Sequence, residues 1–386
     1  METISASSLI KSKDKVVSLQ DYERVVVETD RFLIEDIRPI LMGLYGEVGS
    51  IMAASKKYRR ESKAYPAYKE AVEEEFGDAL WYFSALCRRM GIELAEVFET
   101  ASNKAITNIM SAHDNGVSAI SQFDNFEKAN RLDYALIDLA CVAAQLLRAE
   151  KDSFNVRREL LDFARLYLKA VQATGLSFPK VVNENIIKTL GRFAVPDNDS
   201  LPDFDIKFPE EEQLPRCFEI HITQRESGQT YLRWNDVFIG SPLTDSIRDP
   251  DGYRFHDVFH LAYAAILHWS PTFRALIKHK RKSDPVFDEA QDGGRAVVVE
   301  EGLTAWLYSY SKGLDYFEGH DSVSFDALKT IQKFVQGYEV EKCPLKLWEN
   351  AILHGYSVFR EVKRNNGGVV IGDRENRTIT YRPIGV

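Results

Sequence analysis

The chain has 386 residues, 45% of them hydrophobic, and a formal net charge of −9. This length predicts two domains. The acidic balance excludes a broad nucleic-acid surface or an anionic-membrane surface, because both partners require clustered Lys and Arg.

The amino-terminal stretch METISASSLIKSKDK has no apolar run of signal-peptide length, and the sequence nowhere shows about 18 consecutive apolar residues. Cys87, Cys141, Cys217 and Cys343 are widely separated and lack CxxC or metal-ligand spacing. We therefore expect a cytoplasmic protein with reduced core cysteines and no membrane partner.

The first half of the chain has a helical pattern from about Leu19 to Phe193. Gly and Pro are sparse there, and apolar residues recur three and four positions apart. Gly91 and Gly175 each follow a helical stretch and precede a short apolar turn. We predict an all-α domain over residues 1–195.

This half contains an internal repeat. The segments that begin at Glu75 and Glu159 align without a gap at an offset of 84 residues. The matched pairs are Glu75 with Glu159, Asp78 with Asp162, Gly91 with Gly175, Val97 with Val181, and Lys104 with Lys188. The agreement predicts a duplicated helical unit, over about 30–110 and 130–195, whose copies pack as a pseudo-dimer.

The composition changes after the helical half. Residues 196–215 are rich in Pro and acidic residues without a period, which predicts a linker. Next, CFEIHIT and TYLRWNDVFIG flank the turn QRESGQ and predict a β-hairpin, and the tail predicts a second hairpin that could pair with the first. With a helical region between them, residues 216–386 form a predicted α-rich domain with a small antiparallel sheet. The fold class is mainly α.

Carboxylates mark one face of the helical half. Glu75 and Asp78 lie three residues apart, on one face of a helix, and an upstream apolar helix carries Glu47. Close helix approach is permitted there by three glycines, Gly43, Gly46 and Gly49. Because buried carboxylates must be paired or metal-bound, convergence of these three predicts a Mg²⁺ or Mn²⁺ site. Acidic pairs also occur on solvated faces, the interpretation we adopt for Glu73 and Glu74.

The stretches GLYGEVGSI, EEEFGDALWYFSAL and GIELAEVFETASNKAI resemble, in order and spacing, the MazG-like all-α nucleoside triphosphate pyrophosphohydrolases. The resemblance covers about Pro39 to Lys104, and the repeat extends it weakly to about Phe193. It implies that ExxE and ExxD motifs on neighbouring helices hold Mg²⁺, which binds a nucleoside triphosphate. Water then attacks, and the products are a nucleoside monophosphate and pyrophosphate. The resemblance also implies a homo-oligomer of helical units, which the duplication could replace.

Carried over from this resemblance, Glu47 is the first glutamate of ExxE, and Glu75 and Asp78 form ExxD. Asn103 and Lys104 fall where the family places residues that contact phosphate or sugar. Independently of the resemblance, a positive charge on Lys104 or Lys188 could stabilise the leaving pyrophosphate. The chain departs from the family at Ser50, which stands where the second glutamate of ExxE is expected. A serine removes one negative charge from the site.

The second unit has no ExxE but keeps Glu159 and Asp162 as candidate metal ligands, with Asn185 and Lys188 as candidate substrate-binding residues. This leaves open a composite site made from both units or a decayed one. Aromatic residues near the carboxylates could select the base or belong to the core; these are Tyr45, Trp81 and Tyr82.

The second half has its own candidate site. His256 and His260 lie four residues apart on one helical face with Asp257 beside them, and Glu300 and Glu301 begin another helix. Two histidines and a carboxylate suit Zn²⁺, Mn²⁺ or Fe²⁺. The alternative is a pair of hydrogen-bonded core histidines. The stretch is similar to C-terminal extensions of some MazG-like proteins.

Two functions therefore stay open. The first is hydrolysis of (d)NTP to (d)NMP and pyrophosphate by a metal-dependent hydrolase acting on acid anhydrides. The second is a nucleotide-sensing module that has lost catalysis with the ExxE glutamate and is coupled to a C-terminal effector domain with a His/Asp/Glu metal site. A third interpretation makes the histidine region the main catalytic centre.

Overall fold

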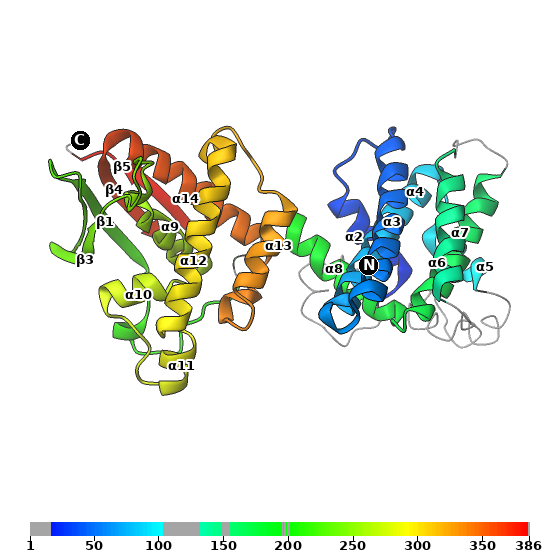
Figure 1. Cartoon of the computed structure of the whole chain (residues 1–386), viewed down its shortest axis with the longest axis horizontal. Helices are drawn as coiled ribbons and strands as arrows, with labels where there is room; N and C mark the ends of the chain where they lie inside the picture. Colours follow the sequence, from blue (N-terminus) through cyan, green and yellow to red (C-terminus); the bar gives the residue numbers. More distant parts are fainter. Residues whose placement is uncertain are drawn as a thin grey trace, which may run out of the picture. The chain divides into compact units, whose positions relative to one another are not determined.

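The computed structural model describes residues 17–102, 132–148, 155–194, 196, 198 and 201–384. The chain divides into two compact units, Met1–Ala194 and Val195–Val386, which run from blue to green and from green to red in Figure 1. The described residues are mainly helical, and the second unit adds a five-stranded antiparallel sheet. The predicted fold class is confirmed.

The first unit is helical throughout its described residues. Its elements are α2 (Leu19–Thr29), α3 (Arg38–Glu61), the 3₁₀ turn η1 (Ser62–Ala64), α4 (Tyr68–Met90), α5 (Leu94–Ala101), α6 (Leu132–Leu146), α7 (Val156–Ala173) and α8 (Phe178–Phe193). Ser18 begins α2 by accepting a hydrogen bond from the backbone N–H of Asp21. Gly91 and Gly175 follow α4 and α7 with φ values of 71° and 74°, a conformation in which glycine is least strained.

The helices of the first unit pack reciprocally. Helix α3 packs on α4, and α6 packs on α7; α4 also packs on α8, and α5 on α7. In the repeat, α4 corresponds to α7 and α5 corresponds to α8. The contact of α4 with α8 is therefore equivalent to the contact of α7 with α5. Such reciprocity is the arrangement expected of a duplicated unit packed as a pseudo-dimer.

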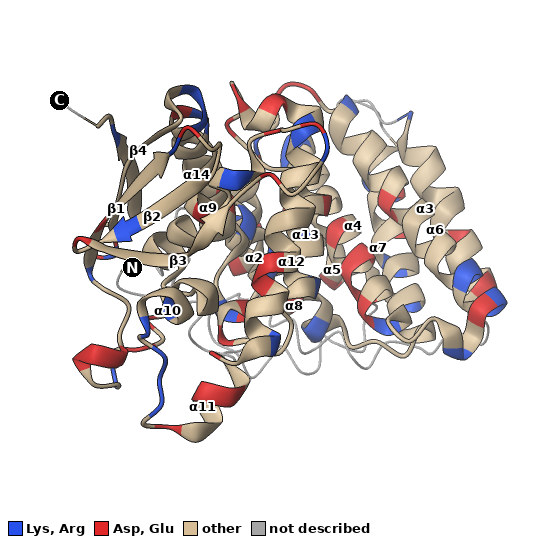
Figure 2. Cartoon of the chain, turned by 60° about the vertical axis from the view of Figure 1, so that its left-hand side comes forward, with Lys and Arg blue, Asp and Glu red and all other residues tan. Residues whose placement is uncertain are grey.

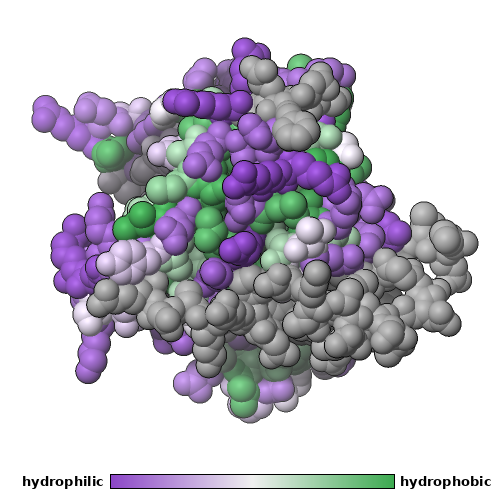
Figure 3. Space-filling view, turned by 90° about the vertical axis from the view of Figure 1, so that its right-hand side faces the viewer, coloured by the Kyte–Doolittle hydropathy of each residue, from purple (hydrophilic) through white to green (hydrophobic). Residues whose placement is uncertain are grey.

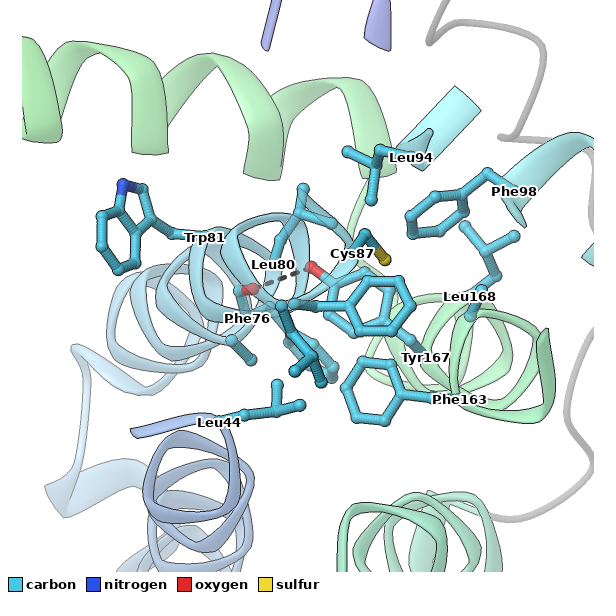
Figure 4. Close-up of a cluster of buried hydrophobic side chains, with 14 of the residues drawn as sticks. Leu44, Phe76, Leu80, Trp81, Cys87, Leu94, Phe98, Phe163, Tyr167 and Leu168 are labelled. Carbon is cyan, nitrogen blue, oxygen red and sulfur yellow. Dashed lines mark hydrogen bonds between the residues drawn. The ribbon is translucent and has the colours of Figure 1, made fainter. Parts of the chain in front are cut away.

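Aromatic side chains join the two halves in the core of this unit (Figure 4). The rings of Phe83 and Phe163 stack with centroids 4.5 Å apart, and Phe76 meets Tyr167 edge-on at 5.5 Å. The Tyr167 hydroxyl donates to the backbone carbonyl of Phe76 at 2.8 Å. Burial of each such ring stabilises the fold by about 1.5–3 kcal/mol. These contacts fix the rotation of α4, and so the direction of its polar face.

The second unit surrounds a sheet of strand order β3-β2-β1-β4-β5. Its elements are η5 (Glu210–Glu212), β1 (Cys217–Gln224), β2 (Thr230–Trp234), β3 (Val237–Leu243), η6 (Tyr253–Phe255), α9 (Asp257–Ala262), the π-helical turn η7 (Tyr263–Leu267), α10 (Pro271–Ile277), α11 (Pro285–Ala290), α12 (Gly294–Ser311), η8 (Lys312–Phe317), α13 (Phe325–Phe334), η9 (Glu339–Lys342), α14 (Leu345–Asn365), β4 (Gly367–Asp373) and β5 (Thr378–Arg382). Helices α9 and α14 pack on β4 and β5, and α12 contacts α9 and α10.

The sheet confirms both predicted hairpins and their pairing, since β1 pairs with β2 and also, antiparallel, with β4. The stretch TYLRWNDVFIG, predicted as one strand, is two. Asn235 and Asp236 have φ values of 47° and 64°, and they join β2 to β3 in a tight turn between Trp234 and Val237. Asn and Asp tolerate this left-handed conformation, which two-residue hairpin turns require.

A buried ion-pair network holds part of the stretch 196–215 within the second unit. Asp205 is 1% exposed and pairs with Arg274 and Arg374. The basic run KHKRKSD also contains a buried residue: Arg281 is 0% exposed and donates to Asp292 at 2.7 Å. Buried charges of this kind are tolerated because each is paired and hydrogen-bonded.

Acidic and basic residues are interspersed along the described ribbon, and acidic residues mark α4 and α12 (Figure 2). Apolar residues are also visible among hydrophilic ones in the view of Figure 3. All four cysteines are free; Cys87 and Cys343 are buried, but Cys141 and Cys217 are exposed, so the prediction of core positions is wrong for these two. Within the described ranges, no helix has the length and apolar character needed to cross a membrane.

Candidate functional site

The predicted carboxylates converge in the first unit. Glu47 lies on α3, and Glu75 and Asp78 lie on the facing side of α4. Each offers one carboxylate oxygen, and the three oxygens all lie within 4.8 Å of one another. All three residues are half-buried. This group has the oxygen-only composition that Mg²⁺ and Mn²⁺ prefer.

Gly43 permits the close packing of α3 against this face of α4. A Cβ atom at Gly43 would lie only 2.2 Å from the ring of Tyr82. Burial and the charges of Glu47 and Asp78 raise the pKa of Tyr82, so its ring borders the carboxylate group. The expectation that Gly46 and Gly49 also permit helix approach is wrong, since a Cβ atom at either would meet nothing within 4 Å.

Helix α8, from the other half of the repeat, completes the site. The side-chain amide of Asn185 donates to Asp78 Oδ1 at 3.2 Å and accepts a hydrogen bond from the Tyr22 hydroxyl at 2.8 Å. Gly77 makes room for it, because a Cβ atom there would lie 2.9 Å from Asn185 Cβ. The sequence placed Asn185 and Lys188 in the second unit without showing that they reach the carboxylates of the first.

Lys188 is the cation of this site. Its ammonium group pairs with Asp78 and, at 2.7 Å, with Glu74. Burial lowers the pKa of Lys188, but the charges of Asp78 and Glu74 outweigh burial and raise it. The expectation that Glu73 and Glu74 are solvated is wrong: Glu74 contacts Lys188, and Glu73 is 6% exposed and pairs with Lys180 at 2.7 Å. A lysine on the facing helix brings these carboxylates into the interface.

Crowding of the carboxylates perturbs Glu47. Burial, a hydrogen bond with Glu75 and the charges of Asp78 and Glu75 raise the pKa of Glu47 to about 8, and Lys188 offsets only part of this effect. At neutral pH the metal-free site therefore holds a proton on Glu47. A divalent cation would supply the positive charge that this proton now provides.

The remaining predicted residues of the first half lie elsewhere. Glu159 and Asp162 are on α7 and partly exposed, and Asp162 lies 4.0 Å from Arg158. The described residues bring no third His, Cys, Asp or Glu to them at metal-binding distances. Asn103 and Lys104 lie outside the described residues. Ser50 lies one turn beyond Glu47 on α3, half-buried.

The second unit brings together three of its five predicted residues. His256, His260 and Glu301 each offer a ligand atom, and these atoms lie within 4.8 Å of one another. Glu300 is 0% exposed and contacts His260 from the other side of the imidazole ring, at Nδ1. Asp257 is also buried, and burial raises its pKa.

Charge balance in this second group favours ionised Glu301. Burial opposes its ionisation, but contacts with His256 and His260 hold the pKa of Glu301 well below the usual range. Burial likewise lowers the pKa of His260, whereas the charge of Glu300 outweighs burial and raises it. Without a metal, the group is therefore held together by paired charges.

Comparison with known proteins finds one similarity, in the second unit. Residues 199–385 match the family model of the MazG C-terminal domain. A search of curated proteins and a search of solved structures find no match to the chain. The part of the chain that carries the His256, His260 and Glu301 group is therefore similar to the MazG C-terminal domain.

Proposed function

We propose that the chain is a metal-dependent nucleoside triphosphate pyrophosphohydrolase, which converts (d)NTP to (d)NMP and pyrophosphate. The observation that carries the proposal is the convergence of Glu47, Glu75 and Asp78 on two packed helices. The MazG-family domain in the second half supports a relationship to pyrophosphohydrolases. The motif resemblance of the first half supports the same reaction.

The residues present fit a bound Mg²⁺ or Mn²⁺. The three carboxylates give an oxygen-only donor set, and the raised pKa of Glu47 reflects its burial next to two other carboxylates. When bound, the metal ion would neutralise phosphate charge and lower the pKa of a coordinated water. A carboxylate that does not bind the metal through both oxygens can accept the proton of the attacking water.

Lys188 and Asn185 have the chemistry of phosphate-binding groups in this proposal. Lys188 carries a positive charge beside Asp78, and Asn185 presents an amide donor to the same carboxylate. Contact of Lys188 with a phosphate oxygen would stabilise charge on the leaving pyrophosphate. Of the two lysines that the sequence offers for this role, we propose Lys188, whereas Lys104 lies outside the described residues.

Aromatic residues near the site could contact the base. Tyr82 borders the carboxylates, and Tyr45 on α3 is 45% exposed. Trp81 is 8% exposed and donates its indole N–H to Thr29 at 2.9 Å. We therefore assign Trp81 to the core and propose Tyr45 and Tyr82 as the aromatic residues nearest a bound nucleotide.

The experiment is pyrophosphate and orthophosphate release from a panel of NTPs and dNTPs with Mg²⁺ or Mn²⁺. Asp78→Asn should abolish pyrophosphate release, whereas the matched variant at the repeat position, Asp162→Asn, should leave it unchanged. Equal loss in both variants would contradict the assignment of the site to α3, α4 and α8. Absence of turnover in the wild-type chain on the whole panel would refute the proposed hydrolysis.

A nucleotide-sensing module is the second candidate, and Ser50 favours it. With serine in place of the second ExxE glutamate, the site has fewer negative ligands for metal ions. Binding would then persist without turnover, and the MazG-family domain would be the effector. Titration calorimetry with each nucleotide tests this alternative: affinity without hydrolysis supports it, and absence of affinity excludes it.

A further inference from the structure

We propose that His256, His260 and Glu301 bind one transition-metal ion, of the Zn²⁺ type, with a coordination position open to solvent. The proposal is independent of nucleotide hydrolysis in the first unit. It concerns only residues of α9 and α12 and the segment before α9, and it assigns a role to each imidazole nitrogen.

The ligand atoms face one another from two helices. His256 Nε2 lies 3.6 Å from Glu301 Oε2, and His260 Nε2 lies 3.4 Å from Glu301 Oε1. The two imidazole rings have centroids 5.6 Å apart. A metal ion about 2.0–2.2 Å from each ligand atom needs such a convergence, with small side-chain shifts.

The other nitrogen of each ring is held by an acceptor. His256 Nδ1 lies 2.9 Å from the backbone carbonyl of Tyr253, which can only accept a hydrogen bond. Nδ1 therefore carries the proton, and Nε2 of the neutral ring carries the lone pair that faces Glu301. Tyr253 also stacks on His256, with centroids 4.3 Å apart and planes 3° from parallel, so both the orientation and the tautomer of this ring are set.

Glu300 does the same for His260. Its Oε1 lies 2.9 Å from His260 Nδ1 and accepts from the Ser270 hydroxyl at 2.6 Å, and its Oε2 accepts from the Thr272 backbone N–H at 2.8 Å. A buried carboxylate that is anchored by two other donors and accepts from the nitrogen of a histidine that faces away from the metal is the usual support of a metal-ligating imidazole. Glu300 is thus a positioning residue.

The observation that favours a bound metal ion is His260 Nε2. The side chain is 1% exposed, and its Nε2 makes no hydrogen bond of acceptable geometry within the described residues. Metal binding uses the neutral ring, and with its proton on Nδ1 this nitrogen presents a lone pair towards the oxygen of Glu301, 3.4 Å away. A cation between them satisfies both.

The ligand set indicates the class of metal. Two imidazoles and one carboxylate suit Zn²⁺, Fe²⁺ or Mn²⁺ rather than Mg²⁺ or Ca²⁺, which prefer oxygen ligands. Three protein ligands leave a position for water, as in catalytic zinc sites. Glu301 is 39% exposed, so solvent reaches the site from its side. A π-helical turn, a feature often found at functional sites, follows His260 at Tyr263–Leu267.

The test is cobalt and zinc titration of the full-length chain after treatment with a chelator and removal of any affinity tag. We expect one Co²⁺ to bind with visible d–d absorption and to be displaced by one Zn²⁺. His260→Ala and Glu301→Gln should weaken binding by more than about 100-fold, and Glu300→Gln by about 10–100-fold. His268→Ala is the matched control, since His268 is also buried and hydrogen-bonded, to the Arg374 carbonyl at 2.8 Å.

Asp78→Asn distinguishes the histidine site from the carboxylate group of the first unit. This variant should leave the cobalt spectrum unchanged. Thermal melting of each variant reports folding, and the half-exposed Glu301 provides a variant that should fold if His260→Ala does not. The proposal is overturned if folded Glu301→Gln binds Co²⁺ like the wild type. It is equally overturned if the folded wild type takes up neither metal, because the histidines are then only partners of buried carboxylates.

Discussion

Glu47→Gln tests the electrostatics of the carboxylate group formed by Glu47, Glu75 and Asp78. The folded chain raises the pKa of Glu47 from 4.5 to about 8, mainly through burial and the hydrogen bond with Glu75. In the unfolded chain the carboxyl ionises near 4.5, its ordinary value. Between these two values the folded state binds more protons than the unfolded state, so the free energy of unfolding falls as the pH rises from 4.5 to about 8.

The two pKa values set the size of this effect. At about 1.36 kcal/mol for each pH unit, the full difference corresponds to about 5 kcal/mol. Glu47 is only half-buried, and solvent screening of a partly exposed group reduces the expected loss to about 2 kcal/mol. Glutamine does not ionise, so Glu47→Gln should be more stable than the wild type at high pH, with a much smaller difference at low pH.

The assay is urea unfolding of the full chain in EDTA at about pH 5 and about pH 9, followed by circular dichroism. The second unit is the same in both proteins. A pH dependence of the difference in unfolding free energy between wild type and Glu47→Gln therefore reports on the group of Glu47, Glu75 and Asp78. Asp138→Asn, at an exposed position on α6, is the control and should show no such change. Parallel pH dependence of wild type and Glu47→Gln would refute the reasoning.

Magnesium gives the complementary measurement. Because a carboxylate must lose its proton to bind a metal, binding near neutral pH should release about one proton from Glu47. Calorimetry in buffers of different ionisation enthalpy measures this release, which Glu47→Gln should abolish. Magnesium binding by the wild type without proton release would mean that Glu47 is not a ligand.

Three further predictions concern the packing and charges of the two units. Gly77→Ala should cost about 1–3 kcal/mol in thermal or urea unfolding, because its Cβ would lie 2.9 Å from a side chain of α8; Gly46→Ala, at an open helical position, should stabilise by about 0.5–1 kcal/mol. Lys188→Met should lower kcat/KM for pyrophosphate release by about 10²-fold, whereas Lys180→Met, which removes an ion pair outside the carboxylate group, should change it little. Asp205→Ala should destabilise the second unit by about 3–5 kcal/mol in urea unfolding, since it leaves two buried arginines without this partner.

Local signals in the sequence were sufficient for most of the secondary structure. The helical periodicity of the first half and the glycines at 91 and 175 depend on neighbouring residues only, and the structure places helix ends there. The hairpins follow from short-range alternation in the same way. The turn at Asn235 and Asp236 was missed because the apolar alternation continues through it, although the Asn-Asp pair is itself a turn signal.

The candidate site was predictable only in part because its residues come from distant segments. Spacing along α4 placed Glu75 and Asp78 on one face, but nothing local shows that Lys188, 110 residues beyond Asp78, pairs with it. The burial of Glu73 and Arg281 was missed for the same reason, since each charge is compensated by a partner far along the chain or on another element. Periodicity predicts a polar residue to be exposed unless its partner is known.

The repeat explains why the described residues of the first unit bring together one such carboxylate group rather than two. Reciprocal packing of α4 on α8 and of α5 on α7 creates two equivalent positions. At the offset of 84 residues, Ala101 stands where Asn185 would be required, and the helix before Glu159 carries no ExxE. Glu159 and Asp162 therefore face a position without the matching amide and third carboxylate, while Asp78 keeps both. A duplicated pair of units needs only one complete site. The second copy supplies the helix that carries Asn185 and Lys188 to the site of the first copy, so Glu159 and Asp162 of the second copy are free to change.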